Sequence, residues 1–281
     1  MERVFSFSGG SLPLGRRTYI MGILNVTPDS FYDGGRYFDP AAAVKKAVSL
    51  AEEGADIIDI GALSTRPNAE RASEAEELRR LRAVLPQIRR ETPLPLSVDT
   101  YRPAVARYCL DEGADIVNDV SGVFNEDMAA LIKAYAAGWV VMHAGPRDAK
   151  TETETEYPGG VVRDVQAFFY GMIEKCAASG VPEEKLCLDP GFGFAKNNRQ
   201  NTALLQGLRT LDTRGCALLA GLSRKRFVRA AAMSETEPDV LNATLAADLI
   251  CASAGADILR VHDVAAHKAL TAPFDRFAVT R

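Results

Sequence analysis

The chain has 281 residues, of which 47% are hydrophobic and 25% are charged. This length and composition are sufficient to bury a large core, which excludes a disordered protein. The formal net charge of −4 gives no overall basic field, so we expect neither nucleic acid nor an anionic membrane as a partner.

Cysteine usage and hydropathy indicate the compartment. The five cysteines stand singly, without a CxxC pair or the spacing of metal ligands. We expect reduced thiols in the core, which favour a cytoplasmic protein. The N-terminal segment lacks the apolar run of a signal peptide, and no stretch approaches the roughly 20 apolar residues of a membrane span.

In chain order, residues 1–16 come first and are expected to form a hairpin extension. RVFSF and the segment from Ser11 to Leu14 flank SGG, which is a hairpin turn signal. Such a hairpin could close the bottom of a barrel.

A repeated unit follows, visible in EEGADIIDIG, DEGADIVNDV and SAGADILRVH. Each copy follows an alanine-rich amphipathic stretch, turns at Gly54, Gly113 or Gly255, and enters a short apolar run. Glycine supplies the left-handed conformation that ends a helix, and the apolar run suits a strand buried on both faces. The pattern therefore predicts a repeat of helix, turn and strand.

Extending this pattern predicts eight alternating strands and helices. Strands are expected near 19–25, 56–60, 95–99, 115–118, 138–142, 185–189, 217–222 and 256–261. Helices are expected near 40–53, 74–90, 102–112, 126–136, 161–179, 200–208, 241–253 and 263–271. Eight such units over about 250 residues favour an α/β fold of the closed (β/α)₈ TIM barrel type, with a doubly wound open sheet as the alternative. We expect residues 1–281 to form a single domain, with a mobile loop at 145–160.

Polar residues occupy the end of nearly every predicted strand. They are Asn25, Asp59, Asp99, Asn118, His143, Asp189, Lys225, Arg260 and His262. A polar residue where one strand ends is ordinary, but the C-terminal ends of barrel strands meet at one mouth, where active sites lie. The repetition therefore predicts a binding site.

The mixture of side chains narrows the class of ligand. Carboxylates and amides such as Asp99, Asn118 and Asp189 suit a planar heterocycle with several N–H donors. The amide oxygen of Asn25 is a hard ligand that suits Mg²⁺. Cationic groups suit an anion, such as a phosphate. These groups are Arg66, Lys225, Arg260 and His262.

Several spaced motifs, in order, resemble dihydropteroate synthase, a family of pterin-binding TIM barrels. They are MGILNVTPDSFYDGG, DIIDIGALSTRP, SVDT, GADIVNDVSG, LDPGFGF, GLSRKRF and RVHD, and the match runs from about residue 19 to 270. The resemblance implies a transferase of folate synthesis, which joins 6-hydroxymethyl-7,8-dihydropterin diphosphate to p-aminobenzoate and releases pyrophosphate. It also implies that the protein requires Mg²⁺, is a target of sulfonamides and forms a homodimer.

The resemblance also implies roles for individual residues. The pterin ring would be held by Asp99, Asn118, Met142, Asp189, Lys225 and Arg260. The diphosphate would meet Asn25 with its Mg²⁺, Arg66, Arg260 and His262. The p-aminobenzoate pocket would use Phe31, Thr65, Pro67, Phe194, Lys225 and Arg226. The catalytic residues would be Asp33, Arg66, Asp99 and Lys225.

A dissociative mechanism is expected. The cationic groups would neutralise charge on the departing pyrophosphate, while Asp99 stabilises the carbocation-like pterin methylene. The aromatic amine then attacks directly, so no nucleophilic side chain is required. The loops that follow the first, second and sixth predicted strands would close over the mouth after the pterin binds, which predicts ordered binding.

Some residues depart from the common family pattern or have a structural interpretation. Leu63, Asn68, Ala195 and Arg226 stand where other residues are frequent, and the segment from Ala144 onward also differs. Asp59 and His143 are interpreted as hydrogen-bonding partners rather than catalysts. The aspartates of the repeated GAD, which are Asp56, Asp115 and Asp257, are expected at the opposite end of the barrel, where they would serve stability.

Three alternative functions remain open. Lys225 could form a Schiff base, as in aldolases, although its SRK context argues against it. A methyltetrahydrofolate-corrinoid methyltransferase would share the pterin residues but would not need Asn25, Arg66 and His262. A non-catalytic paralogue would bind pterin diphosphate without condensing it.

Overall fold

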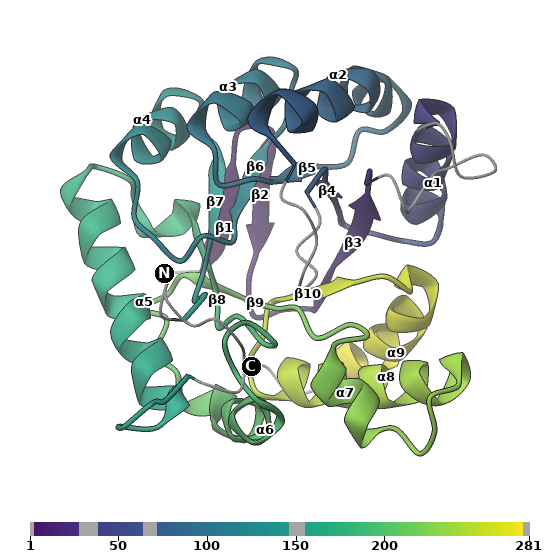
Figure 1. The fold of residues 1–281 in the computed structure, drawn as a ribbon, viewed down its shortest axis with the longest axis vertical. Coiled ribbons are helices and arrows are strands. Elements are labelled where there is room, and N and C mark those ends of the chain that lie inside the picture. Colours follow the sequence, from purple (N-terminus) through teal and green to yellow (C-terminus); the bar gives the residue numbers. More distant parts are fainter. Residues whose placement is uncertain (1–2, 28–38, 64–71, 146–154, 278–281) are drawn as a thin grey trace.

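The computed structural model describes residues 3–27, 39–63, 72–145 and 155–277. Eight parallel strands close into a barrel in the order β3 to β10, with β10 paired to β3 (Figure 1). The strands are β3 Tyr19–Asn25, β4 Ile57–Gly61, β5 Leu96–Asp99, β6 Ile116–Asp119, β7 Gly138–Met142, β8 Leu186–Asp189, β9 Ala217–Ala220 and β10 Ile258–Val261. The predicted TIM barrel is confirmed, and the open sheet is wrong.

Helices surround the barrel (Figure 1). In the described residues they are α1 Pro40–Glu52, α2 Glu74–Glu91, α3 Pro103–Asp111, α4 Glu126–Ala134, α5 Val161–Ala178, α6 Asn198–Gly207, α7 Arg226–Ala231, α8 Glu237–Ser253 and α9 Val264–Phe277, with short 3₁₀ turns η1 Glu183–Lys185 and η2 Leu208–Thr210. The sequence pattern missed α7, whose six residues are too few to show a period. The predicted mobile loop at 145–160 lies mostly outside the described residues.

Helix starts follow local chemistry. The Ser73 hydroxyl accepts a hydrogen bond from the backbone N–H of Glu76, and the first turn of α2 is acidic while its last turn is basic. At α6, Asn197 and Gln200 bond to each other's backbone N–H groups in a capping box. This second cap fixes where the β8–α6 loop ends.

The N-terminal hairpin closes the end of the barrel at which the strands begin, as expected. Strands β1 Val4–Phe7 and β2 Gly10–Pro13 pair antiparallel. Phe5 and Phe7 pack with the buried residues that begin the barrel strands, which include Ile57, Ile116 and Ile258. A Cβ atom on Gly138 would lie 2.8 Å from the Phe5 ring, so only glycine admits the plug there.

The GAD repeat forms the same structure three times. Gly54, Gly113 and Gly255 have φ values of 98°, 91° and 105°, the left-handed conformation that glycine was predicted to supply. The following aspartate carboxylates accept hydrogen bonds from backbone N–H groups of neighbouring strands. These pairs are Asp56 with Ile20 (2.9 Å), Asp115 with Leu96 (3.0 Å) and Asp257 with Leu218 (3.0 Å).

Each GAD carboxylate also meets an arginine. The ion pairs are Arg17–Asp56 at 2.7 Å, Arg89–Asp115 at 3.2 Å and Arg3–Asp257 at 2.8 Å. The three aspartates lie at the starts of their strands, opposite the mouth, so their predicted position is confirmed.

Two further observations concern the cysteines and the helices. All five cysteines are buried and free of disulfide bonds. Among the described residues, no helix is both long enough and apolar enough to cross a membrane.

Asp115→Ala tests the stabilising role of the repeat. The change removes the acceptor for the buried N–H of Leu96 and the partner of Arg89, so the free energy of unfolding should fall by about 2–3 kcal/mol. Urea denaturation measures the loss. The control is Glu235→Ala, which truncates an exposed side chain. Equal stability of the two variants would contradict the role of Asp115.

Candidate active site at the barrel mouth

Polar side chains at the mouth lie above an apolar layer inside the barrel, because side chains alternate between the two faces of each strand. Side chains two residues apart on a strand face the same way, so Asp59, Asn118, Asp189 and Arg260 lie one step above the buried layer that packs on the hairpin. The layer residues that precede them by two positions are Ile57, Ile116, Cys187 and Ile258. The barrel interior is therefore apolar below and polar at the mouth.

The structure places ten of the predicted site residues at this end. Asn25, Asp99, Met142 and Asp189 end their strands, and Asn118 and Arg260 lie within β6 and β10. His262 directly follows β10, Phe194 and Lys225 lie in the connections after β8 and β9, and Arg226 begins α7. Phe31, Asp33, Thr65, Arg66 and Pro67 lie outside the described residues, as does Asn68.

A buried ion cluster forms the centre of the mouth. Arg260 Nε lies 2.7 Å from Asp59 Oδ2, and its NH2 group lies 3.1 Å from Asp99 Oδ2. Asp59 is fully buried, so its charge requires partners. It accepts two further hydrogen bonds, from the Ser97 hydroxyl at 2.6 Å and from Asn118 Nδ2 at 3.1 Å. Asp59 thus joins four strands, in agreement with its interpretation as a hydrogen-bonding partner.

Two carboxylates share one guanidinium, and the pKa values of Asp99 and Arg260 reflect this. Burial raises the pKa of Asp99 to about 7, with Arg260 opposing the rise and Asp59 adding to it. Burial lowers the pKa of Arg260, but the attraction of Asp59 and Asp99 more than compensates and leaves it raised. Asp99 is therefore poised to change charge near neutral pH.

Asp189 faces the mouth from β8. Its Oδ1 accepts the backbone N–H of Gly191 at 2.7 Å, which orients the carboxylate. Burial raises its pKa, and nearby Lys225 opposes the rise. The side chain remains able to accept further N–H groups, since a carboxylate has about four acceptor positions.

Lys225 connects the β9–α7 turn to the β8–α6 loop. Its ammonium donates to the carbonyl oxygen of Phe192 and lies 4.3 Å from the centre of the Phe194 ring. Gly193 has φ of 77°, and a Cβ atom there would lie 2.7 Å from the Lys225 side chain. The lysine therefore occupies space that only glycine leaves open.

Arg224 holds the turn that carries Lys225. This residue has φ of 59°, an uncommon conformation for a residue other than glycine. Its guanidinium makes a bidentate contact with Asp263, at 3.0 and 2.7 Å, and reaches Glu237 at 2.9 Å. These charge-assisted bonds stabilise the turn against its strained backbone.

His262 is held beside Arg260. Its Nδ1 lies 2.9 Å from the Ser223 hydroxyl, which also accepts the backbone N–H of His262 at 3.3 Å. Burial, Arg260 and Arg224 lower its pKa to about 4, so the imidazole is neutral at physiological pH. We assign the Ser223 hydroxyl as the donor and Nδ1 as the acceptor, so the ring proton lies on Nε2, where it can be donated to a ligand.

His143 lies beside the mouth among aromatic rings. Its Nε2 lies 2.8 Å from Asp164 Oδ1, and its ring packs against Tyr157 and Phe168. Burial and the charge of Lys196 lower its pKa to about 4. These contacts agree with its interpretation as a hydrogen-bonding partner.

The described residues contain no group of three or more His, Cys, Asp or Glu side chains that could enclose a metal ion. Asn25, at the end of β3, offers a single amide oxygen. One protein oxygen fits Mg²⁺, which commonly keeps several waters and binds through substrate phosphates.

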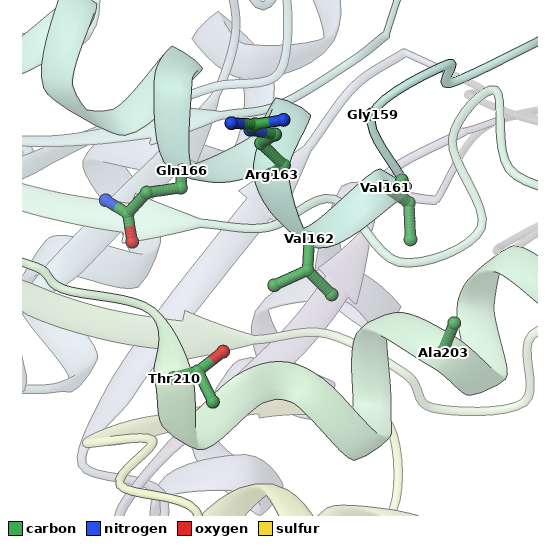
Figure 2. Close-up of a pocket in the computed structure, with 8 residues that line it drawn as sticks. Gly159, Val161, Val162, Arg163, Gln166, Ala203 and Thr210 are labelled. Atoms are coloured by element: carbon green, nitrogen blue, oxygen red, sulfur yellow. The ribbon is translucent and has the colours of Figure 1, made fainter.

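A separate pocket of ≈ 580 Å³ lies in the outer helical layer, between the start of α5 and the α6–η2 segment (Figure 2). Its lining residues are Gly159, Gly160, Val161, Val162, Arg163, Gln166, Ala203 and Thr210. None of the predicted site residues lines it, so the mouth remains the candidate site.

The variant Arg260→Met tests the electrostatics of the cluster. Removing the cation removes an attraction that lowers the pKa of Asp99, so this pKa should rise above about 7. Carbon-13 NMR titration of the aspartate carboxyl groups measures the change. Arg107→Met, on the exposed face of α3, serves as the control and should leave the pKa of Asp99 where it is. An unchanged or lower pKa in Arg260→Met would refute the coupling.

Comparison with known proteins adds independent findings. The family model described as pterin binding enzyme matches residues 21–262. A dihydropteroate synthase of Synechocystis is 41% identical over 90% of this chain and 87% of its own length. The solved Xanthomonas albilineans dihydropteroate synthase with 4-aminobenzoic acid superposes with a TM-score of 0.89 at 40% identity, covering 99% of this chain and 100% of that one. The same enzyme in complex with 7,8-dihydropteroate superposes with a TM-score of 0.83 at 39% identity, covering 96% and 97% of the two chains.

Proposed function

Because the chain belongs to the pterin binding enzyme family, we propose that its barrel mouth carries out the dihydropteroate synthase reaction. This transferase reaction of folate synthesis joins 6-hydroxymethyl-7,8-dihydropterin diphosphate to p-aminobenzoate and releases pyrophosphate. The observation that carries the proposal is the buried cluster of Arg260, Asp59 and Asp99. This cluster holds Arg260 and Asn118 in place, and Asp99, Asn118 and Asp189 offer acceptors for a heterocycle.

The pterin ring lies among the buried polar groups. Asp189 accepts from a ring N–H and the exocyclic amine, while Asp99 and Asn118 meet other ring positions. Lys225 donates to the ring oxygen. Met142, which ends β7 and is buried, packs beside the ring. A buried polar set of this kind rejects ligands that leave its groups unpaired.

The diphosphate lies toward β10 and β3. The guanidinium of Arg260 and the Nε2–H of His262 donate to its oxygens, and Arg66 of the β4–α2 loop is proposed to join them. Asn25 would hold Mg²⁺, which when bound would supply positive charge near the phosphates.

The p-aminobenzoate pocket is assigned to Phe194, Lys225 and Arg226. The ring of Phe194 already faces the Lys225 ammonium, and the Arg226 side chain is exposed where a carboxylate can approach it. The residues proposed to complete the pocket are Phe31, Thr65 and Pro67.

The chemistry is a substitution at the pterin methylene carbon. The C–O bond to the diphosphate breaks, and its electron pair leaves with pyrophosphate. Ionised Asp99 stabilises the positive charge that builds on the pterin. The amine nitrogen of p-aminobenzoate then forms the C–N bond and loses one proton. Arg66 and Lys225 support the charge changes, and Asp33 is proposed to assist them.

The state of the protein in the cell is also proposed. Five buried thiols without disulfide bonds fit the reducing cytoplasm. Residues 1–281 act as one domain, with residues 1–16 as its hairpin extension, and two copies form a homodimer. Sedimentation at assay concentrations measures the assembly, and a monomer would contradict the proposed homodimer.

The decisive experiment supplies the protein with pterin diphosphate, p-aminobenzoate and Mg²⁺. Formation of dihydropteroate with equimolar pyrophosphate is expected, and a sulfonamide should compete with p-aminobenzoate. Binding without product would indicate a non-catalytic paralogue. Methyl transfer from methyltetrahydrofolate without pyrophosphate would indicate the methyltransferase.

The pH profile of the same assay tests the role of Asp99. Because its pKa is raised to about 7, the carboxyl group gains a proton as the pH falls below this value and can no longer stabilise positive charge. We therefore expect kcat/KM for pterin diphosphate to fall below about pH 7. In Asp99→Asn this acid limb should disappear, with kcat/KM at pH 8 reduced by about 10²–10³.

The substrate's own phosphates titrate in both enzymes, so the difference between the two profiles isolates Asp99. The same acid limb in Asp99→Asn would assign the titration to another group.

A further inference from the structure

Lys196 is fully buried, which its sequence context does not predict. It lies in the β8–α6 loop, between the predicted site residue Phe194 and the start of α6, and its side chain has no exposed surface. A lysine is almost never fully buried unless its ammonium is paired. The mechanism proposed above leaves this residue without a role.

Three backbone carbonyl groups surround the ammonium. Lys196 Nζ lies 3.2 Å from the oxygen of His143, 2.8 Å from that of Gly191 and 3.1 Å from that of Phe194. The first belongs to the loop after β7, and the other two belong to the loop after β8. One side chain therefore ties two neighbouring loops of the mouth together.

The number of donors matches the number of acceptors. A protonated lysine has three N–H groups, one for each carbonyl, whereas a neutral amine has two and would turn a lone pair toward an oxygen. Burial lowers the pKa of Lys196 to about 7, while Asp189 raises it and Lys225 lowers it further. The three carbonyl dipoles favour the protonated form against the cost of burial.

The surrounding backbone leaves the loop little freedom. Gly191 has φ of 67°, and a Cβ atom there would lie 2.0 Å from the oxygen of His143. On the other side, Asn201 donates to the carbonyl oxygen of Lys196 at 2.8 Å and accepts the N–H of Gly193 at 2.7 Å. Ala195 has φ of 46°, so the chain holds a left-handed turn there without glycine.

We propose that Lys196 is a positioning residue for the second substrate, because it fixes the backbone of Phe194 and thereby the aromatic wall that faces Lys225. The links are direct: Lys196 holds the carbonyl of Phe194, and the Phe194 ring lies 4.3 Å from the Lys225 ammonium. This inference rests on the proposed function, in which Phe194 and Lys225 both line the p-aminobenzoate pocket.

The test compares Lys196→Met with Lys196→Gln. Methionine keeps the length of the side chain but donates no hydrogen bond, whereas glutamine keeps an NH₂ group with two donors. The KM for p-aminobenzoate should rise about ten- to a hundredfold in Lys196→Met and less in Lys196→Gln. The affinity for pterin diphosphate, measured by calorimetry, should change less than about threefold in both, since Asp99, Asn118 and Asp189 are held by their strands.

The matched control is Lys185→Met. Lys185 also donates to a backbone carbonyl, that of Ala136 at 2.6 Å, but it precedes β8 at the opposite end of the barrel. Its loss should leave both constants as they are in the wild type.

Each outcome decides the question. An unchanged KM for p-aminobenzoate, or an equal loss of affinity for both substrates, overturns the positioning role. Failure of both variants to fold, by circular dichroism, also overturns it, because the lysine would then serve stability alone. A wild-type protein that makes no dihydropteroate would refute the proposed function instead.

Discussion

The guanidinium of Arg260, held between two buried carboxylates, is the contact on which the barrel mouth depends. Asp59 is fully buried, and an unpaired charge in that position would cost several kcal/mol. Its pairing with Arg260 leaves Asp99 sharing the same cation, at 3.1 Å, with a pKa raised to about 7. The hydrogen bond from Asn118 to Asp59 extends the cluster to β6. Four strands thus present a preorganised polar surface whose charge is not fully balanced, and that surface can receive a heterocycle that becomes cationic.

The two ends of the barrel use aspartate in opposite ways. At the starts of the strands, Asp56, Asp115 and Asp257 accept backbone N–H groups and meet arginines near the surface, which holds neighbouring strands in register. At the mouth, Asp99 accepts a hydrogen bond from Arg260 and Asp189 accepts one from the N–H of Gly191, which leaves both carboxylates with further acceptor positions. The first arrangement stabilises the fold, and the second keeps acceptor capacity for a ligand. The apolar layer over the N-terminal hairpin separates them.

The elements of the barrel could be predicted from sequence because each unit repeats the same local signals. Strands β3 and β7 have the predicted bounds, and Gly54, Gly113 and Gly255 end helices as expected. Helix α8 begins at Glu237, ahead of the predicted residue 241, since its first turn carries a proline that the apolar period does not register.

The contacts within the site were harder to predict. Spacing placed Asp59, Asp99, Asn118, Asp189 and Arg260 at one rim. It could not show that Asp59 would pair with Arg260 and Asn118, because pairing across β4, β6 and β10 depends on the closure of the barrel. Ser97 could have been identified from the sequence, because it precedes Asp99 by two residues on the same strand and therefore faces the same side. No sequence pattern identifies Lys196, because the three carbonyl groups that it binds belong to two different loops, and no local pattern predicts that these loops meet. The roles of Phe31, Asp33, Thr65, Arg66 and Pro67 stay predictions, because these residues lie outside the described ranges.

The central claim is that the buried ion cluster prepares the mouth for the pterin. Calorimetric binding of pterin diphosphate to Asp59→Asn tests it most directly, because Asp59 acts through Arg260 and Asn118 and is not assigned to the ligand. The control is Asp164→Asn, which changes a half-exposed carboxylate beside His143. The account predicts that the dissociation constant rises about tenfold or more in Asp59→Asn alone, the effect of disturbing one charge-assisted contact. Wild-type affinity in a folded Asp59→Asn protein would contradict it.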